Sequence, residues 1–526
     1  MLNRTNGVSI FQHPMFGAIL IFFLSMGINL IGIDRLSLTS DECFSIYHAQ
    51  MSPRLIYHHL STGNNPPLYE WILHFWMGWF GDSAFSVRFL SLIFSSLTTA
   101  AIFILGLQMA ATDRPSTERR GNLRLGILAA TFFLASNYST FLAHEARTYN
   151  LTLFLATLST LLFLRSLRDH RGWMIYGMVG GLMCLSHFFG AWILLSHGCF
   201  WLWQYRLDKR NFSPWLKMLL GFGISFGWYI PNLWYRFVDS ASQGTWVNPA
   251  PWDAPYLTLW KYLNTPAATI LAMILLVYAV VRLVVYPTST GESPVQKQNT
   301  QLLLWLFALP FFGQWLLSLD HPFSIPMFTE RYASITLPFL CLILAMSLSG
   351  LREHFNQWIY NVLLPLFLLT ILSGKNFTPP NQACVKEALQ KTAKELKKTS
   401  TENTPIILEP YHTAFQALYY ADHQRFQQYH PEDIYNHLAH QLSHSNIWIL
   451  KTEKSLDSLG LSQKKSLAYL DFGAEKSNHT KKIESQLLAL TNQGGKSKIE
   501  HIQLPTSLWG TFKISHEAKF WLIEKK

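Results

Sequence analysis

The stretch PMFGAILIFFLSMGINLIGI, residues 14–33, decides the fold class of this chain. It is apolar except for Ser25 and Asn29, and such a run can cross a hydrocarbon core of ~30 Å as one helix. Because it is long and poorly followed by small residues, we predict a retained membrane anchor rather than a cleaved signal peptide. The acidic pair Asp41-Glu42 comes soon after it. Charges placed at membrane depth are costly, so this pair indicates a functional site.

Similar apolar runs recur over the first 375 residues. Only 14% of the chain is charged and 49% is hydrophobic, whereas a soluble domain usually has about a quarter charged residues. We therefore predict an α-helical polytopic membrane protein with about eleven transmembrane helices. The predicted spans cover residues 14–33, 86–110, 125–141, 149–164, 173–190, 191–205, 215–231, 265–286, 301–318, 332–350 and 357–373.

The distribution of Lys and Arg orients these spans in the cell (inner or plasma) membrane. With a cytoplasmic N-terminus, the cytoplasmic segments hold fifteen Lys and Arg residues, and the outer segments before residue 375 hold seven. Since positive residues favour the cytoplasmic side, we predict a cytoplasmic N-terminus. An odd number of spans then places the C-terminal segment on the periplasmic or extracellular side. The same orientation brings the polar motifs described below to the outer face.

Residues 376–526 have a different pattern. Lys386–Lys398 predicts an amphipathic helix, and Pro405–Leu408 and Ile447–Leu450 predict buried strands. We therefore predict a small extracytoplasmic α/β domain over residues 376–526, next to a transmembrane catalytic domain over residues 1–375. The formal charge of +11 follows from the positive-inside bias and a solvated tail, so it does not indicate a nucleic-acid partner.

Asp41 and Glu42 lie in a long outer segment, residues 34–85. One carboxylate could take a proton from an acceptor hydroxyl as a general base, while its neighbour orients the acceptor or a metal. The alternative is a solvated acidic pair, because loops outside membranes tolerate acids freely.

The motif Asn64-Asn65-Pro66-Pro67-Leu68-Tyr69 predicts a rigid turn ahead of a helix, since proline restricts its own backbone and that of its predecessor. An Asn could cap this helix, or the free N–H groups at its start could attract phosphate. Both interpretations can hold together.

Residues 144–149, His-Glu-Ala-Arg-Thr-Tyr, interrupt the apolar pattern between the third and fourth spans. The planar fork of Arg147 matches phosphate oxygens. The alternative is a Glu145–Arg147 ion pair that only ends a helix. His187, among aromatic residues, is either structural or part of the site. Arg331 opens the tenth span and either binds a lipid phosphate or extends to the headgroups.

As a set, these motifs resemble those of the polytopic GT-C glycosyltransferases. The match is to the branch with the protein O-mannosyltransferases, bacterial aminoarabinose transferase and the lipopolysaccharide sugar transferases. It rests on the order and spacing of three motifs and covers about residues 15–200, with Glu330-Arg331-Tyr332 in addition. The segments that carry it are Ser40–Glu42, Asn65–Tyr69, Phe80–Ser83, Ser86–Phe89 and His144–Tyr149.

The resemblance implies a GT-C fold and an inverting transfer of one sugar from a polyprenyl-phosphate donor. The acceptor would be a glycolipid such as lipopolysaccharide, a glycan or a protein, reached on the outer face among membrane lipids. Asp41 becomes the catalytic carboxylate with Glu42 beside it, and Arg147 a contact to the donor phosphate. The other substrate-binding candidates are Asn65, Tyr69, His144, Glu145, Tyr149, His187, Arg331 and Tyr332.

One departure from the family pattern concerns a metal. In the aminoarabinose branch a Glu-Lys pair, implicated in metal and phosphate contacts, precedes Pro-Pro, whereas this chain has Asn64-Asn65. We therefore assign no metal ligand, and a role for a divalent metal stays open. The alternative function is a lipid-linked-sugar flippase or another transporter, which would call for polar residues at mid-span and repeat symmetry. A third is an interaction domain on a degenerate membrane scaffold.

Overall fold

The computed structural model describes most of the chain. The described residues are 14–61, 65–110, 119–205, 213–243, 247–285, 294–321, 324–354, 357–377, 385–398, 404–430, 433–449, 456, 459–472, 478–492, 496–503, 507–509, 512–514 and 517–524.

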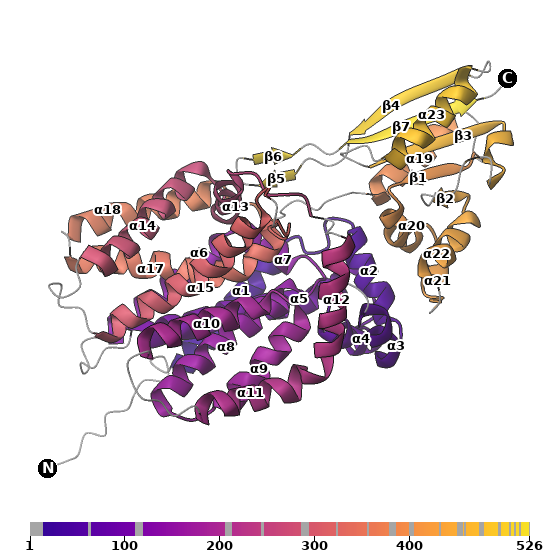
Figure 1. Cartoon of the computed structure of the whole chain (residues 1–526). Coiled ribbons are helices and arrows are strands. Elements are labelled where there is room, and N and C mark those ends of the chain that lie inside the picture. The colour runs from indigo at the N-terminus through magenta and orange to yellow at the C-terminus, as the bar shows by residue number, and fades with distance from the viewer. Residues whose placement is uncertain are drawn as a thin grey trace, which may run out of the picture.

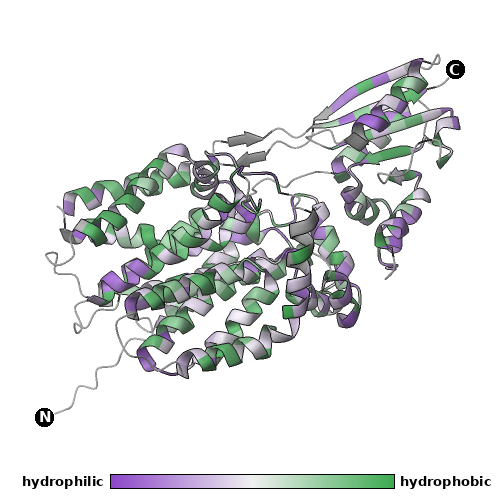
Figure 2. Cartoon of the chain, in the orientation of Figure 1, coloured by the Kyte–Doolittle hydropathy of each residue, from purple (hydrophilic) through white to green (hydrophobic). Residues whose placement is uncertain are grey.

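Apolar helices make up the first part of the chain (Figures 1 and 2). Each of the eleven predicted ranges falls on helix. The helices of this bundle are α1 (Pro14–Leu30), α5 (Ala84–Ala110), α6 (Arg119–Ala135), α7 (Asn137–Ala143), α8 (Tyr149–Asp169), α9 (Trp173–Ser186), α10 (Gly190–Tyr205), α11 (Ser213–Phe226), α14 (Pro266–Val285), α15 (Pro294–Ser318), α16 (Glu330–Ala333), α17 (Leu337–His354) and α18 (Gln357–Ser373).

Among the described residues, five helical segments are long and apolar enough to cross a membrane, and the bent pair α6–α7 makes a sixth. Three further predicted spans, α1, α9 and α18, are shorter apolar helices. The chain is therefore a multi-pass membrane protein. The segment that starts at Glu330 is 89% buried and forms the centre of the bundle, whereas α14 is only 33% buried and presents most of its surface outward.

Two details of the predicted spans are wrong. The range 125–141 is not one straight helix, because α6 and α7 meet at 71°. The range 215–231 is divided too, since α11 ends at Phe226 and a 3-10 turn, η2 (Gly227–Tyr229), leads into α12 (Ile230–Gln243).

The predicted outer loop, residues 34–85, is largely helical. It holds α2 (Ser40–Ala49), α3 (Pro53–Ser61) and α4 (Leu68–Phe80), and α13 (Ala254–Leu263) is a further short helix between spans. These helices are too short to cross a membrane, and the sequence pattern did not predict α2 or α3.

Contacts between helix termini define two ends of the bundle. At one end, the side chain of Asn299 in α15 donates to the carbonyl of Met109 in α5. At the other end, a ring nitrogen of His144 is 2.6 Å from the carbonyl oxygen of Asn29, and the hydroxyl of Thr148 donates to the carbonyl of Ser186. We call this second end the site end, because α2 and the candidate residues lie there.

The C-terminal part is a mixed sheet with helices around it (Figure 1). The strand order is β2-β1-β3-β7-β4, in which β1 pairs in parallel with β2 and β3, and β7 pairs antiparallel with β3 and β4. The strands are β1 (Ile406–Glu409), β2 (Ile447–Ile449), β3 (Ser466–Asp471), β4 (Lys496–Gln503) and β7 (Glu517–Glu524), and a separate pair is β5 (Ser507–Trp509) with β6 (Phe512–Ile514).

Five helices accompany this sheet: α19 (Val385–Lys398), α20 (Ala414–Ala421), α21 (His423–Phe426), α22 (Ile434–Ser443) and α23 (Asn478–Asn492). Short 3-10 turns complete the elements, η3 (Ser334–Thr336), η4 (Tyr411–Thr413) and η6 (Leu461–Gln463). The helix predicted from Lys386 and both predicted strands are present, although Leu450 lies outside the described residues. Parallel β1 and β2 require a crossover, and the helices α20 to α22 supply it.

Candidate active site

The helix α2 begins with a capping box that fixes its first turn. Thr39 is the N-cap, and its hydroxyl accepts from the backbone N–H of Glu42 at 3.1 Å. In return, a carboxylate oxygen of Glu42 accepts from the N–H of Thr39 at 2.7 Å. These reciprocal bonds satisfy two N–H groups at the helix start. Asp41 therefore lies in the first turn of a helix, where a negative charge is favoured, and not in a loop.

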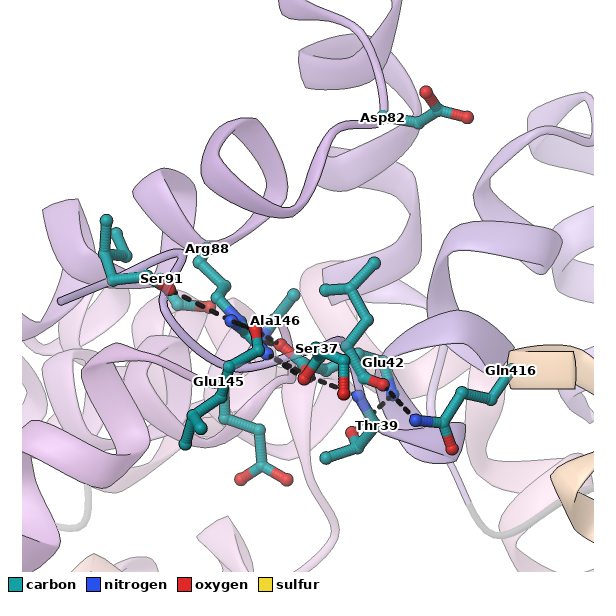
Figure 3. Close-up of polar contacts among 12 residues, drawn as sticks. Ser37, Thr39, Glu42, Asp82, Arg88, Ser91, Glu145, Ala146 and Gln416 are labelled. Carbon is teal, nitrogen blue, oxygen red and sulfur yellow. Dashed lines mark hydrogen bonds and ion pairs between the residues drawn. The ribbon is translucent and has the colours of Figure 1, made fainter. Parts of the chain in front are cut away.

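Glu42 is a buried anchor of this helix. Its carboxylate accepts two bonds from the guanidinium of Arg88 in α5, at 2.7 and 2.8 Å, and a third from the backbone N–H of Ala146 at 2.9 Å (Figure 3). Burial alone would raise the pKa of Glu42, but the positive charge of Arg88 and these bonds hold it below its ordinary value. Glu42 thus joins α2, α5 and the residue 144–148 loop.

The remaining N–H groups of Arg88 bind the segment between α1 and α2. They donate to the carbonyl oxygens of Ile33 at 3.0 Å, Leu36 at 2.8 Å and Ser37 at 2.9 Å. Arg88 is itself only 2% exposed. Breaking such a buried ion pair leaves an uncompensated charge, so this contact fixes the position of α2 strongly.

Asp41 points away from that anchor and stays half exposed, with 50% of its side chain accessible. One carboxylate oxygen accepts from Nη1 of Arg331 at 2.7 Å. Desolvation would raise the pKa of Asp41, but the positive charges of Arg147 and Arg331 lower it below its ordinary value. Asp41 is therefore an ionised carboxylate that a substrate can reach.

Arg147 is buried beside the same helix. Its Nη1 donates to the hydroxyl of Ser45 at 2.7 Å and to the backbone carbonyl of Asp41 at 3.3 Å. The same nitrogen is 4.0 Å from a carboxylate oxygen of Glu70 in α4. The guanidinium also lies over the ring of Phe44 at 5.8 Å. The side-chain acid beside Arg147 is thus Glu70, and the alternative of a helix-ending Glu145–Arg147 pair does not describe this contact.

Glu145 faces Arg331. Nη2 of Arg331 is 3.4 Å from a carboxylate oxygen of Glu145, while its Nη1 binds Asp41. Glu145 is only 2% exposed, and burial raises the pKa of Glu145 to about 7 despite the positive charge of Arg331. One guanidinium therefore bridges an exposed carboxylate and a buried one.

Aromatic side chains form the wall next to Arg331. The ring of His187 lies 5.9 Å from that of Tyr149 and 5.1 Å from that of Tyr332. With Phe189 and Arg331 these residues line a small cavity. Phe189 also lines an apolar groove of ≈ 460 Å³ with Phe188, Ala191, Trp192, Leu195 and Met327. The cationic end of the site thus continues into an apolar surface.

The other predicted residues lie at the edge of this cluster. His144 binds the carbonyl of Asn29 through its ring, as described above. The hydroxyl of Tyr69 is 3.2 Å from that of Ser91, and both residues are buried. Asn64 lies outside the described residues. α4 has Pro67 at its N-cap without a side-chain cap bond, so Asn65 does not cap this helix.

Three residues of the site were not predicted. Glu70 is buried near Arg147 and accepts from the hydroxyl of Ser45 at 2.8 Å. Its signal was an acid inside an apolar segment. Arg88 was part of a motif without an assigned role. His412 comes from the C-terminal part, and its carbonyl accepts from the hydroxyl of Ser40. The sequence pattern could not predict this contact, because the two residues are 372 positions apart. Within the described ranges, no three His, Cys, Asp or Glu side chains gather so that they could hold a metal ion.

Comparison with known proteins gives a family for part of the chain. Residues 64–235 match the family of dolichyl-phosphate-mannose-protein mannosyltransferases. The predicted resemblance to the GT-C glycosyltransferases is confirmed by this match. No curated protein matches the chain in sequence.

Solved structures similar to this chain include two GT-C enzymes. ArnT from Cupriavidus metallidurans, bound to undecaprenyl phosphate, has 12% identity and a TM-score of 0.48, over 96% of this chain and 98% of that one. An oligosaccharyltransferase from Archaeoglobus fulgidus has 10% identity and a TM-score of 0.45, over 76% of this chain and 63% of that one.

Proposed function

We propose that this chain is a membrane glycosyltransferase that moves one sugar from a polyprenyl-phosphate donor to an acceptor hydroxyl. In this proposal residues 1–375 form the catalytic domain and residues 376–526 an α/β domain, both meeting at the outer face of the membrane. The observation that carries it is that both arginines contact Asp41: Arg331 donates to its half-exposed carboxylate, and Arg147 donates to its backbone carbonyl. The family match over residues 64–235 supports the reaction class.

Arg147 and Arg331 supply the donor contact in this mechanism. The leaving group is a polyprenyl phosphate, whose negative charge grows as its bond to the sugar breaks. Such a group needs fixed positive charge, and donors that are already in place stabilise it without reorganisation. Arg331 is now paired with the carboxylates of Asp41 and Glu145, and Arg147 lies 4.0 Å from a carboxylate oxygen of Glu70. A phosphate can replace those carboxylates as the partner of the two guanidinium groups.

Asp41 acts as the general base. Its carboxylate takes the proton of the acceptor hydroxyl while the acceptor oxygen forms a bond to the anomeric carbon. The bond between that carbon and the phosphate oxygen breaks on the opposite face, so the configuration inverts. When the phosphate draws Arg331 away from Asp41, the carboxylate loses a stabilising charge and becomes a stronger base.

Glu42 has a different role in the proposal. Its two oxygens are engaged by Arg88, Ala146 and Thr39, and a proton on it would disrupt the ion pair with Arg88. We therefore assign the base to Asp41, and to Glu42 the task of holding α2.

The test is sugar transfer by Asp41→Asn in membranes that contain the donor lipid. General-base catalysis is typically worth about 10²- to 10⁴-fold, so transfer should fall by that factor. The variant should still bind the donor lipid, because Asp41 acts in proton transfer and not in donor binding. Asp34→Asn is the matched control, because Asp34 is another exposed acid just after α1, and it should keep full activity.

Normal transfer by Asp41→Asn would remove the base assignment. Movement of intact lipid-linked sugar across the membrane, without a glycosylated product, would instead support the alternative of a flippase.

A further inference from the structure

The segment that leads into α2 is held by the C-terminal part of the chain as well as by the bundle. Leu38 is fully buried. Its backbone N–H donates to the hydroxyl of Tyr420 at 2.6 Å, and its carbonyl accepts from Nε2 of Gln416 at 2.5 Å. Figure 3 shows Gln416 approaching from the side opposite Arg88. Both backbone groups of Leu38 therefore depend on side chains of α20.

Further contacts lie on both sides of Leu38, at Ser37 and along α2. The hydroxyl of Ser37 donates to the carboxylate of Glu387 at 2.9 Å. The ring of Phe415 in α20 lies 5.4 Å from those of Phe44 and Tyr47. We call this set of contacts between residues 37–47 and the C-terminal part the α2 seam. It combines polar bonds at the start of the helix with aromatic packing along it.

We propose that Gln416 and Tyr420 are positioning residues for Asp41, so that the C-terminal part takes part in catalysis by fixing the helix that carries the base. This inference rests on the proposed function. Glu42 anchors one face of α2 to the bundle, and the α2 seam fixes the other face. Asp41, between them, is then held at the orientation that proton transfer needs.

The physical argument is one of length and geometry. An isolated helix of ten residues is not stable in water, so α2 depends on its packing partners. Its first turn is defined by the capping box at Thr39, which directly follows Leu38. A buried backbone N–H without a partner is costly, so loss of the Tyr420 hydroxyl should displace Leu38 and with it the first turn. A displacement of about 1 Å is enough to lower a rate by about 10²-fold.

The test compares two neighbouring tyrosines of α20 in the full-length protein. Tyr420→Phe removes the hydroxyl that accepts from Leu38 and keeps the ring, over which the ammonium of Lys386 lies. Tyr419→Phe is the matched control, because its hydroxyl donates to the carbonyl of Asp82 in the α4–α5 connection instead. We expect kcat to fall about 10- to 10²-fold in Tyr420→Phe with an unchanged KM for the donor, and to change less than about twofold in Tyr419→Phe.

Two further measurements separate positioning from a general loss of structure. In the Asp41→Asn background, Tyr420→Phe should cause no additional loss of transfer, because the residue acts through Asp41. Gln416→Met keeps the side-chain volume but removes the donor to the carbonyl of Leu38. It should also lower kcat, and it therefore tests the proposal even if Tyr420→Phe does not fold. Equal losses with and without Asp41 would overturn the proposal.

Hydrogen exchange of the α2 amides gives a readout that needs no transfer assay. Exchange should be faster in Tyr420→Phe and unchanged in Tyr419→Phe. If the wild-type chain transfers sugar and Tyr420→Phe keeps its kcat, the positioning role is wrong while the proposed function stands. If wild type transfers no sugar although exchange responds as expected, the proposed function is wrong and only the α2 seam remains.

Discussion

At the scale of single residues, the site is a balance of charges around Asp41. Two guanidinium groups lie within ion-pair distance of three carboxylates. Arg331 is close to Asp41 and Glu145, and Arg147 is close to Glu70. A phosphate that enters must compete with these carboxylates. Under the proposed function, a phosphate replaces these carboxylates as the partner of the two arginines, which favours an anionic donor over a neutral sugar.

Arg147→Ala is expected to raise the KM for the donor and to lower kcat, because the guanidinium would bind phosphate in both the ground and the transition state. A donor of this kind is worth about 10²- to 10³-fold in kcat. Arg147→Lys should restore only part of the rate, since an ammonium lacks the planar fork. Steady-state kinetics with the lipid donor measure both effects.

Arg54→Ala is the control for that experiment, because Arg54 is an exposed arginine at the start of α3. Wild-type kinetics for Arg147→Ala would reduce Arg147 to a structural residue of the α2–α4 contact.

Glu145→Gln is expected to change how stability depends on pH. Because burial raises the pKa of Glu145 to about 7 from an ordinary value of 4.5, the folded protein binds a proton that the unfolded chain releases. Stability contributed by this group is present below pH 4.5 and is lost as pH rises through 7. The Gln variant should lack this loss.

Melting temperatures of the purified protein in detergent, taken between pH 5 and 8, measure the difference between wild type and Glu145→Gln. Identical pH profiles for the two would mean that folding does not raise the pKa of Glu145.

At the scale of elements, the apolar helices could be predicted because length and hydropathy alone decide whether a segment can span a membrane. The bend between α6 and α7 could not. The apolar pattern continues across Ser136, and only the structure shows that its hydroxyl caps α7 by accepting from Tyr138 and Ser139. Likewise α2 and α3 are short and take their stability from neighbours, so their own sequences carry little helical signal.

The ion pair between α2 and α5 should be a main source of local stability. Glu42→Leu leaves the charge of Arg88 buried without its partner, and such a change typically costs about 3–5 kcal/mol. The double variant Glu42→Leu with Arg88→Met removes both charges and should recover part of that loss. Free energies of unfolding for the two single variants and the double variant measure the coupling. Simple additivity would mean that the pair contributes nothing beyond packing.

At the scale of the whole molecule, the positions of the candidate residues were predicted better than their partners. Asp41, Arg147 and Arg331 do come together, as the outer-face placement of their motifs suggested. The role of Arg88 and the contribution of α20 could not be predicted, because both depend on contacts between segments far apart in sequence. Hydropathy orders segments across a membrane but carries no information about such pairs.

The orientation of the chain is a prediction that reporter fusions can check. The bundle contacts place α2 and the C-terminal part at the same end, and the Lys and Arg distribution predicts that this end is the outer one. Alkaline phosphatase fused after Lys526 should be active, and a cytoplasmic reporter at the same position should be silent. The reverse result would invert the predicted orientation.

The α2 seam also has a consequence for the order of events during synthesis. Ser37 and Glu387 are 350 positions apart, and Leu38 and Tyr420 are 382 apart. β3 pairs with β7, which ends at Glu524, so the sheet beside α20 closes only when the last strand has been made. During synthesis, the growing chain would contain Asp41, Arg147 and Arg331 well before α20 is present to bind Leu38. A chain released before Glu517 is expected to insert and yet to consume no donor lipid, because the sheet beside α20 would lack β7.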